Sequence, residues 1–437
     1  MSRDAPPHPH VEVIERRGLH GHAHLARTRR REGRLLEEQS LEAAVLAHAN
    51  DPHGHLRARP RRTGREVYGP GRAARCPRAA GSQPRGARGV PVGYALQPMP
   101  SRTTVPTTMQ AAIYRGANDL RVETVPVPKL GTGEVLVRVE ACGVSPSDVK
   151  RVQMGIGPFG RVLGNEIAGT VAAVADDVDE WRPGERVVVH TARGEPGEED
   201  LGGGFAEYVR VPADVVDDGG LVEIPRDVSV EEAVFLEPVN TCLRGIRLLD
   251  LDEESVVLVA GVGSLGLILQ QLAIREGATV VAADPIGGRL ELAGELGAAR
   301  IVDPSREDMH LACKELTEGR GADAAIVAAV GAGPVRDAIR ATRPRAKILL
   351  FGQIAKGEET AVDVGDVCLD EKHLIGSHSW SADEAEEADE VVFRREIELA
   401  RLITHRFPLE RIAEAFHWAG ERKRDVGKVV VLPGKAE

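Results

Sequence analysis

The stretch VVLVAGVGSLG, residues 256–266, determines how the rest of the chain is interpreted. A run of apolar, mostly β-branched residues, typical of a buried strand, passes directly into the spacing G-x-G-x-x-G. Apolar residues then recur at helical spacing through residues 265–273, and Gly277 stands where that helix would end. A second apolar run ends at Asp284, 18 residues beyond Gly266. This order of strand, glycine-rich turn, helix, strand and acid predicts a dinucleotide-binding unit.

Each position of the glycine-rich loop has a physical task in such a unit. Gly261 permits the tight turn, Gly263 lets the backbone approach a pyrophosphate, and Gly266 lets the helix pack closely on the strand. The N–H groups of the helix N-terminus, where Ser264 and Leu265 stand, hold the phosphates. The alternative is a glycine-rich turn in some other α/β unit.

The acid at the end of the second strand predicts the choice of cofactor. Asp284 would accept a hydrogen bond from a ribose 2′-hydroxyl and would repel a 2′-phosphate at close range. We therefore predict NAD(H) rather than NADP(H). Arg289 is near enough in sequence to take part in cofactor binding, or else it faces solvent.

Charge divides the chain into two parts. The 437 residues carry a net charge of −11, but residues 1–108 hold 19 arginines, no lysine and 9 acids, a net charge of +10. Residues 109–437 therefore carry a net charge of −21, which disfavours nucleic acid as a partner. We interpret residues 1–108 as a disordered or mis-started N-terminal extension, with Met109 opening the patterned chain. Phosphate binding by its arginine clusters is the alternative.

Other compositional features limit the class of protein. No apolar run reaches 18 residues, and residues near the N-terminus lack the apolar h-region of a secretory signal, so we expect neither a membrane span nor a membrane partner. The five cysteines are isolated and form no C-x-x-C pair, which is typical of a cytoplasmic protein. Length alone suggests two or three domains.

The secondary-structure pattern changes along the chain. Short strands separated by glycine-rich turns fill residues 109–240 and predict a β-barrel-like domain. Regular alternation of strands and helices fills residues 241–375, with a helix at 241–249, and predicts a parallel sheet covered on both faces. Residues 376–437 are predicted to return to the catalytic β-barrel-like domain, with helices at 382–403 and 409–419 and a closing strand at 429–432.

Several motifs then resemble one family, the medium-chain dehydrogenase/reductase superfamily, over roughly residues 109–437. The motifs are ACGV at 141–144, LGNEIAGTV at 163–171, GGFAEY at 203–208, EPVNT at 237–241 and THRFPL at 404–409. The resemblance implies an α/β fold with a GroES-like β-barrel catalytic domain and a Rossmann domain with a doubly wound parallel sheet. It also implies an NAD(P)-linked oxidoreductase that acts on a small alcohol or carbonyl substrate as a homodimer or homotetramer.

The zinc ligands of the alcohol and polyol dehydrogenases in that superfamily are largely replaced. Ser145 and Asn165 stand where the resemblance places a ligand cysteine and a ligand histidine, while Glu237 matches the third ligand and Glu166 the neighbouring acid. A serine hydroxyl and an amide oxygen are poor donors to Zn²⁺. We therefore expect no catalytic zinc, with Glu237 and Glu166 as the ligands if a metal is bound. Structural zinc is not expected either, because residues 191–201 contain no cysteine.

The candidate catalytic residues are Ser145, Ser147, Asn165 and Glu166. Ser147 either passes a proton and holds a carbonyl oxygen, or caps the helix that starts near residue 148. Asn165 either hydrogen-bonds the substrate or satisfies backbone in a loop. Glu166 and Glu237 are flanked by apolar residues, so each needs a metal, a perturbed pKa or a partner, which we expect to be an arginine if no zinc is bound.

Four further residues have weaker interpretations. Cys142 and Cys242 lie in apolar surroundings and are expected in the core rather than as nucleophiles. His405 is expected at the surface or an interface, and His378 near the cleft between the domains.

Two other functions remain open from the sequence. The tetrapeptide SPSD at 145–148 resembles the Asn-Pro-x-Asp of zinc-free quinone and enoyl reductases in the same superfamily. An intact cofactor loop beside a reactive centre that has lost its ligands is also what a nucleotide-binding protein without turnover would show.

Overall fold

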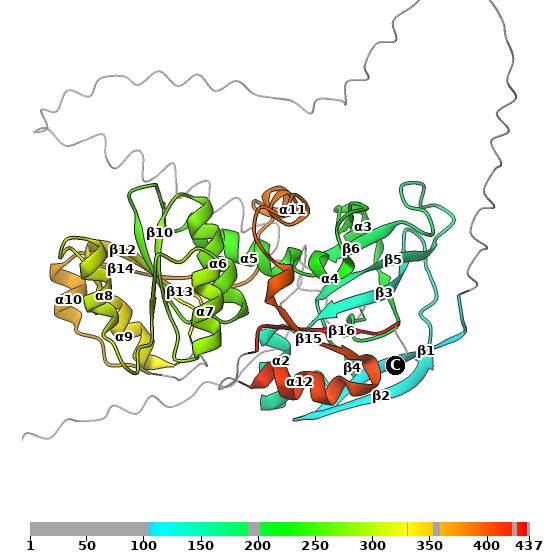
Figure 1. The fold of residues 1–437 in the computed structure, drawn as a ribbon. Helices are drawn as coiled ribbons and strands as arrows, with labels where there is room; N and C mark the ends of the chain where they lie inside the picture. Colours follow the sequence, from blue (N-terminus) through cyan, green and yellow to red (C-terminus); the bar gives the residue numbers. More distant parts are fainter. Residues whose placement is uncertain (1–104, 191–201, 330, 353–358, 422–425, 435–437) are drawn as a thin grey trace, which may run out of the picture. The chain divides into compact units, whose positions relative to one another are not determined.

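The computed structural model describes residues 105–190, 202–329, 331–352, 359–421 and 426–434 (Figure 1). These residues belong to one compact unit that begins at Ala95. The expected extension lies outside the described residues except for its last four positions. There the described structure extends further toward the N-terminus than expected, because the Thr107 carbonyl accepts a hydrogen bond of 3.1 Å from the Val127 N–H and the first strand begins at Thr108.

The β-rich part of the fold forms two sheets, from residues 108–223 together with two strands near the C-terminus. A three-stranded sheet has the order β2–β1–β4, and a seven-stranded sheet has the order β15–β16–β3–β5–β6–β8 with β7 paired to β3. The strands are β1 (Thr108–Gly116), β2 (Asp119–Pro126), β3 (Val135–Gly143), β4 (Arg161–Val162), β5 (Glu166–Val174), β6 (Arg186–His190), β7 (Tyr208–Val211), β8 (Leu221–Glu223), β15 (Ile403–Pro408) and β16 (Lys428–Leu432). The larger sheet has a hydrophobic core on each face, so that in β5 Ile167 and Ala168 belong to different cores. This explains why its strands are apolar runs rather than alternating patterns.

The second part is a six-stranded sheet in which every strand pair is parallel, in the order β11–β10–β9–β12–β13–β14. Its strands are β9 (Val256–Ala260), β10 (Thr279–Ala283), β11 (Arg300–Val302), β12 (Ala322–Val327), β13 (Thr342–Leu350) and β14 (His373–Gly376). Its helices are α6 (Ser264–Arg275), α7 (Gly287–Glu295), α8 (Met309–Leu316), α9 (Ala332–Ala341) and α10 (Val364–Leu369). α6 and α7 pack on one face, and α8 and α9 on the other. This is the predicted doubly wound Rossmann sheet, whose strand order reverses at β9.

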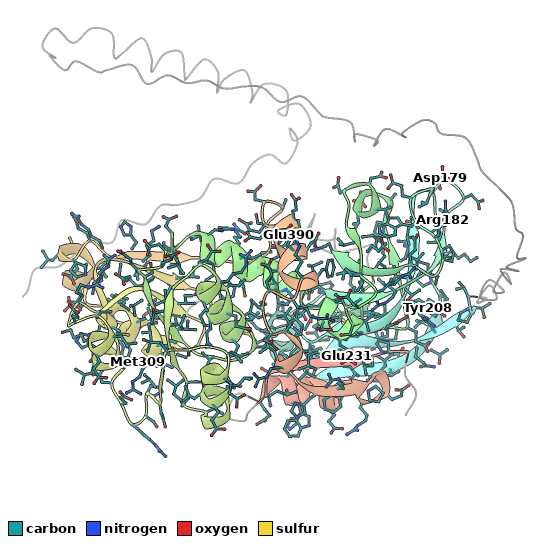
Figure 2. The ribbon with its side chains drawn as sticks, turned by 45° about the horizontal axis from the view of Figure 1, so that its top comes forward. Asp179, Arg182, Tyr208, Glu231, Met309 and Glu390 are labelled. Atoms are coloured by element: carbon teal, nitrogen blue, oxygen red, sulfur yellow. The ribbon has the colours of Figure 1, made fainter. Side chains whose placement is uncertain are left out.

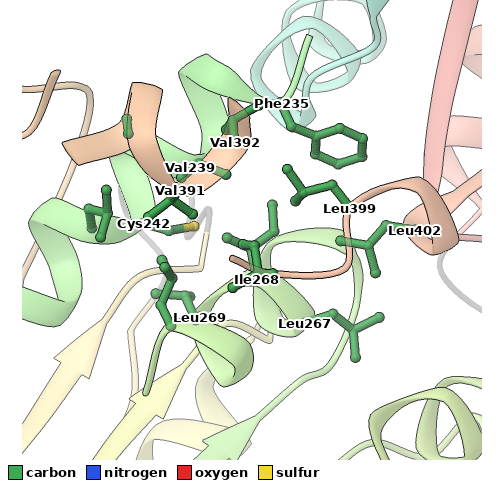
Figure 3. Packing of buried hydrophobic residues seen from close by; sticks show 14 of the residues in the cluster. Phe235, Val239, Cys242, Leu267, Ile268, Leu269, Val391, Val392, Leu399 and Leu402 are labelled. Atoms are coloured by element: carbon green, nitrogen blue, oxygen red, sulfur yellow. The ribbon is translucent and has the colours of Figure 1, made fainter. Parts of the chain in front are cut away.

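A shared core connects the two parts of the fold. It is built on α5 (Leu236–Arg247), α6 and α11 (Ala385–Phe393), and it also includes residues of β3, β5, β6 and β16. Figure 3 shows Val239 and Cys242 close to Val391 in this core, and Phe235 close to Leu399. Cys242 and Cys142 are both fully buried, which confirms the prediction that they are core residues.

The single helix predicted for residues 382–403 is wrong. α11 ends at Phe393, and the chain turns at Arg395, which has a φ of 52°. The N–H of Glu396 returns to the carbonyl of Val391, closing the helix end, and the chain then enters a short 3₁₀ turn (Ala400–Leu402) and strand β15. The apolar periodicity continues past this stop, so the pattern alone does not reveal it.

The remaining helices are short. They are α2 (Pro146–Met154), α3 (Ala213–Asp217), α4 (Val230–Ala233), the 3₁₀ turn at Leu409–Arg411 and α12 (Ile412–Gly420). α5 begins five residues before the predicted 241, because Pro238 falls in its first turn, where proline is tolerated. Among the described residues, no helix has the length and apolar character that crossing a membrane requires.

Candidate active site

The glycine-rich loop has the geometry that its sequence predicts. Gly261 has a φ of 96°, and a Cβ there would lie 2.6 Å from the backbone nitrogen of Ala329. A Cβ on Gly266 would lie 2.0 Å from the Gly261 carbonyl oxygen, so only glycine lets α6 approach the turn. Gly263, the N-cap of α6, faces open space, with only a side-chain nitrogen of Arg289 at 3.8 Å. The loop therefore has the open approach to helix N–H groups that a pyrophosphate requires.

A cleft of about 560 Å³ opens in front of this loop. Its lining includes Gly261, Gly263, Ser264, Leu265, Gly266, Asp284 and Arg289 from the Rossmann part, and Val144, Pro146, Val149, Lys150, Lys428 and Val429 from the β-rich part. Met309, at the start of α8 (Figure 2), is also among the residues that line the cleft. Ligands of doubly wound sheets bind at this position, where the strand order reverses.

Asp284 is fixed at the end of β10. One carboxylate oxygen accepts a hydrogen bond of 3.0 Å from the Val262 N–H, and the other accepts one of 3.0 Å from the Ile286 N–H. Arg289 Nη1 lies 3.7 Å from Asp284 Oδ2, and Arg289 Nη2 donates to the Val426 carbonyl at 3.2 Å. Arg289 therefore lies in the cleft beside the acid, which decides between the two placements that the sequence left open.

The serines at the start of α2 form a short hydrogen-bonded chain. Ser145, not Ser147, is the N-cap: the Asp148 N–H donates to Ser145 Oγ at 3.0 Å, and Ser145 Oγ donates to Asp148 Oδ2 at 2.8 Å. Ser147 Oγ lies 2.7 Å from Ser145 Oγ. The helix-capping role considered for Ser147 is therefore wrong. Ser147 is exposed at the outer end of this hydrogen-bonded chain, and its sequence neighbour Pro146 lines the cleft.

Glu166 forms a buried ion pair, but with a lysine rather than the expected arginine. Its carboxylate contacts the ammonium group of Lys428, and the two side chains are only 1% and 3% exposed. Burial raises the pKa of Glu166, while the charge of Lys428 opposes that shift. The sequence analysis did not single out Lys428.

Two more carboxyl groups lie near this ion pair. Burial raises the pKa of Glu237 to about 8, and the negative charge of Glu166 adds to that shift. Burial also raises the pKa of Asp148, although its hydrogen bonds from Ser145 oppose the shift. At neutral pH, Glu237 is therefore mostly protonated, and Lys428 is the cation that faces this group of acids.

His190 is a second residue that the sequence analysis missed. It pairs in register with Glu166 on the neighbouring strand, so the two side chains share one face of the sheet. The side chain is 5% exposed, its Nε2 lies 3.9 Å from Asp389 Oδ1, and its ring packs against Trp380. Neither ring nitrogen has a hydrogen-bond partner among the described residues.

The other predicted residues are less closely tied to the cleft. Asn165 is half-buried and directly precedes β5. His378 is exposed, and its carbonyl accepts a hydrogen bond of 2.9 Å from Arg244. His405 is half-buried and stacks on Trp418 with ring centroids 4.6 Å apart.

The residues at this site do not fit a zinc ion. The Ser145 hydroxyl is engaged as a helix cap, and the Glu166 carboxylate is engaged by an ammonium group. Within the described part of the chain, no three histidine, cysteine, aspartate or glutamate side chains are grouped so that they could hold a metal.

Comparison with known proteins identifies the class. The alcohol dehydrogenase GroES-like domain matches residues 131–225, and the zinc-binding dehydrogenase domain matches residues 264–394. Human sorbitol dehydrogenase is 31% identical over 341 residues, which cover 70% of this chain and 90% of that protein. The chain belongs to the medium-chain dehydrogenase/reductase superfamily and is an oxidoreductase of the alcohol and polyol dehydrogenase type.

Two solved structures show the same fold. The 2R,3R-butanediol dehydrogenase of Bacillus subtilis is 26% identical with a TM-score of 0.66, covering 75% of this chain and 100% of that one. A zinc-binding dehydrogenase of Sinorhizobium meliloti 1021, bound to NADP, is 27% identical with a TM-score of 0.68, at the same coverage. The cofactor bound in the second structure supports a nicotinamide cofactor for this chain.

Proposed function

We propose that the chain is an NAD(H)-dependent dehydrogenase of polyols or vicinal diols that works without bound zinc. The cleft position of Asp284 supports NAD(H), since its carboxylate would repel a 2′-phosphate. Two of the similar enzymes are named after sorbitol and 2,3-butanediol, and both compounds carry hydroxyl groups on adjacent carbons. This common feature supports a vicinal diol as the substrate class.

The observation that carries the proposal is the hydrogen-bonded chain of Ser147, Ser145 and Asp148 beside the cleft. When the single hydroxyl hydrogen of Ser145 points to Asp148, Ser147 donates to Ser145. A proton taken from a substrate hydroxyl by Ser147 then moves inward by two short transfers. The first runs from Ser147 to Ser145, and the second from Ser145 to Asp148.

Asp148 is suited to the end of this chain. Because burial raises its pKa, protonation of the carboxylate is less costly than in water. A nicotinamide bound at the glycine-rich loop would supply the hydride chemistry that turns the alcohol into a carbonyl. The hydride and the relayed proton together account for both hydrogens that the alcohol loses.

The test is turnover of the purified full chain with NAD⁺ and either sorbitol or (2R,3R)-butanediol, followed by absorbance at 340 nm. The Ser147→Ala variant should lose most of the turnover, roughly 10²-fold or more, with NADH binding unchanged. NADH binding without turnover of any alcohol or carbonyl would instead assign the chain as a nucleotide-binding protein. Turnover restricted to quinones or activated double bonds would assign it as a reductase of the zinc-free type.

A further inference from the structure

The Glu166–Lys428 ion pair crosses over a glycine at the ends of three adjacent strands. Glu166 opens β5 and Lys428 opens β16, and β3 lies between these two strands and ends at Gly143. Gly143 pairs in register with Glu166 on one side and with Val430 on the other. A Cβ on Gly143 would lie 1.8 Å from Glu166 Oε2 and 2.7 Å from Lys428 Cε. The space that holds the ion pair therefore exists because this position is glycine.

The ammonium group of Lys428 is held at a defined place. It contacts the Glu166 carboxylate, donates to the Val144 carbonyl at 3.3 Å, and lies 5.9 Å from the centre of the Phe235 ring. An ammonium group has three N–H donors, and the described residues supply acceptors for two of them. Lys428, Val144 and Val429 all line the cleft. A third N–H is thus available to an oxygen atom in the cleft.

Burying a charged pair is costly, and it rarely improves stability over an apolar pair of similar size. The neighbouring carboxyl group of Glu237 makes this buried cation unusual, because burial raises the pKa of Glu237 to about 8 and so favours its neutral form. A fixed cation in a site of low dielectric is, however, well suited to stabilise negative charge that develops on a reacting oxygen.

We infer that Lys428 is the electrophilic residue of the site: its ammonium group donates to the substrate oxygen and stabilises the negative charge on it during hydride transfer. Glu166 is a positioning residue, which holds the ammonium over Gly143, and Ser147 takes the proton. The ammonium group of Lys428 thus supplies the positive charge at a site whose side chains do not suit a metal ion. This inference rests on the proposed dehydrogenase function.

The main test replaces Lys428 with the uncharged Lys428→Met in the full chain. The matched control is Lys372→Met, because Lys372 is 4% exposed, donates to a carbonyl at 2.8 Å and pairs with a carboxylate at 3.3 Å, but does not line the cleft. The kcat of Lys428→Met should fall by roughly 10²–10³-fold, while the Kd for NADH changes little. Lys372→Met should keep its kcat, and Lys428→Arg should recover part of the lost activity.

Two results would overturn the inference. A weaker Kd for NADH with kcat unchanged would assign Lys428 to the cofactor phosphates, and an unchanged kcat and Kd would give it no role in the reaction. If the wild-type chain binds NADH but turns over no alcohol, the proposed function fails separately.

A second measurement needs no variant and applies even if Lys428→Met does not fold or the wild-type chain is inactive. It compares binding of glycolate and of its neutral isostere glycolamide to the wild-type complex with NADH, by calorimetry. A cation facing the substrate predicts tighter binding of glycolate, by roughly tenfold. Equal binding of the two compounds would contradict the placement of the ammonium group.

Discussion

Removing one charge of the Glu166–Lys428 pair should destabilise the fold far more than removing both. Glu166→Gln leaves the ammonium group buried without its counter-charge, and Lys428→Met does the same to the carboxylate. With side chains 1% and 3% exposed, water cannot replace the lost partner, so each single variant should lose about 3–5 kcal/mol. The double variant Glu166→Gln/Lys428→Met buries no isolated charge and should lose less than the sum of the single losses, by about 2 kcal/mol or more.

The assay is urea unfolding at pH 7, followed by tryptophan fluorescence, for the wild type, the two single variants and the double variant. Trp380 packs against His190 beside the shared core, and Trp418 lies at the β-rich part, so the emission reports on both regions. Losses that simply add in the double variant would refute the reasoning. They would mean that the two charges do not depend on each other.

Three further predictions follow from the cleft and its neighbours. The wild type should have a lower Kd for NADH than for NADPH. Asp284→Ser should reduce the ratio of these two Kd values by roughly tenfold, measured by calorimetry. Gly266→Ala should abolish NADH binding, because its Cβ would lie 2.0 Å from the Gly261 oxygen, whereas Gly287→Ala, whose Cβ would contact nothing within 4 Å, should bind normally. Because the pKa of Glu237 rises from 4.5 to about 8 on folding, the folded state holds this proton more tightly, so the free energy of unfolding should fall as pH rises between these values. Glu237→Gln should flatten that fall in urea titrations at pH 5 to 8.

The cofactor loop was predictable because its determinants are local. Gly261, Gly263 and Gly266 act through spacing within six residues, and each has the conformation or close approach that its position required. The end of α6 was also predictable, since Gly277 has a φ of 95° and follows the last helical turn. Backbone geometry of this kind is set by residues that are close in sequence, so the sequence alone predicts it.

The reaction centre was only partly predictable because its determinants are distant in sequence. That Glu166 needs a partner follows from its apolar neighbours, but the partner depends on β16 pairing beside β3. This pairing brings Lys428 to Val144, 284 positions away. His190 was not expected at the site, because only the register with Glu166 shows that its ring faces the same side of the sheet. The serine residues were recognised, but which of them caps α2 depends on backbone angles that the sequence does not reveal.

The most direct test of the account is the metal dependence of turnover. The purified full chain is analysed for zinc, dialysed against a chelator and assayed with NAD⁺ and (2R,3R)-butanediol at 340 nm. We predict well under one zinc per chain and the same kcat before and after chelation, because we propose that Ser147 and Asp148 transfer the proton and that Lys428 stabilises the charge. One zinc per chain, lost together with activity and restored with it, would contradict the account.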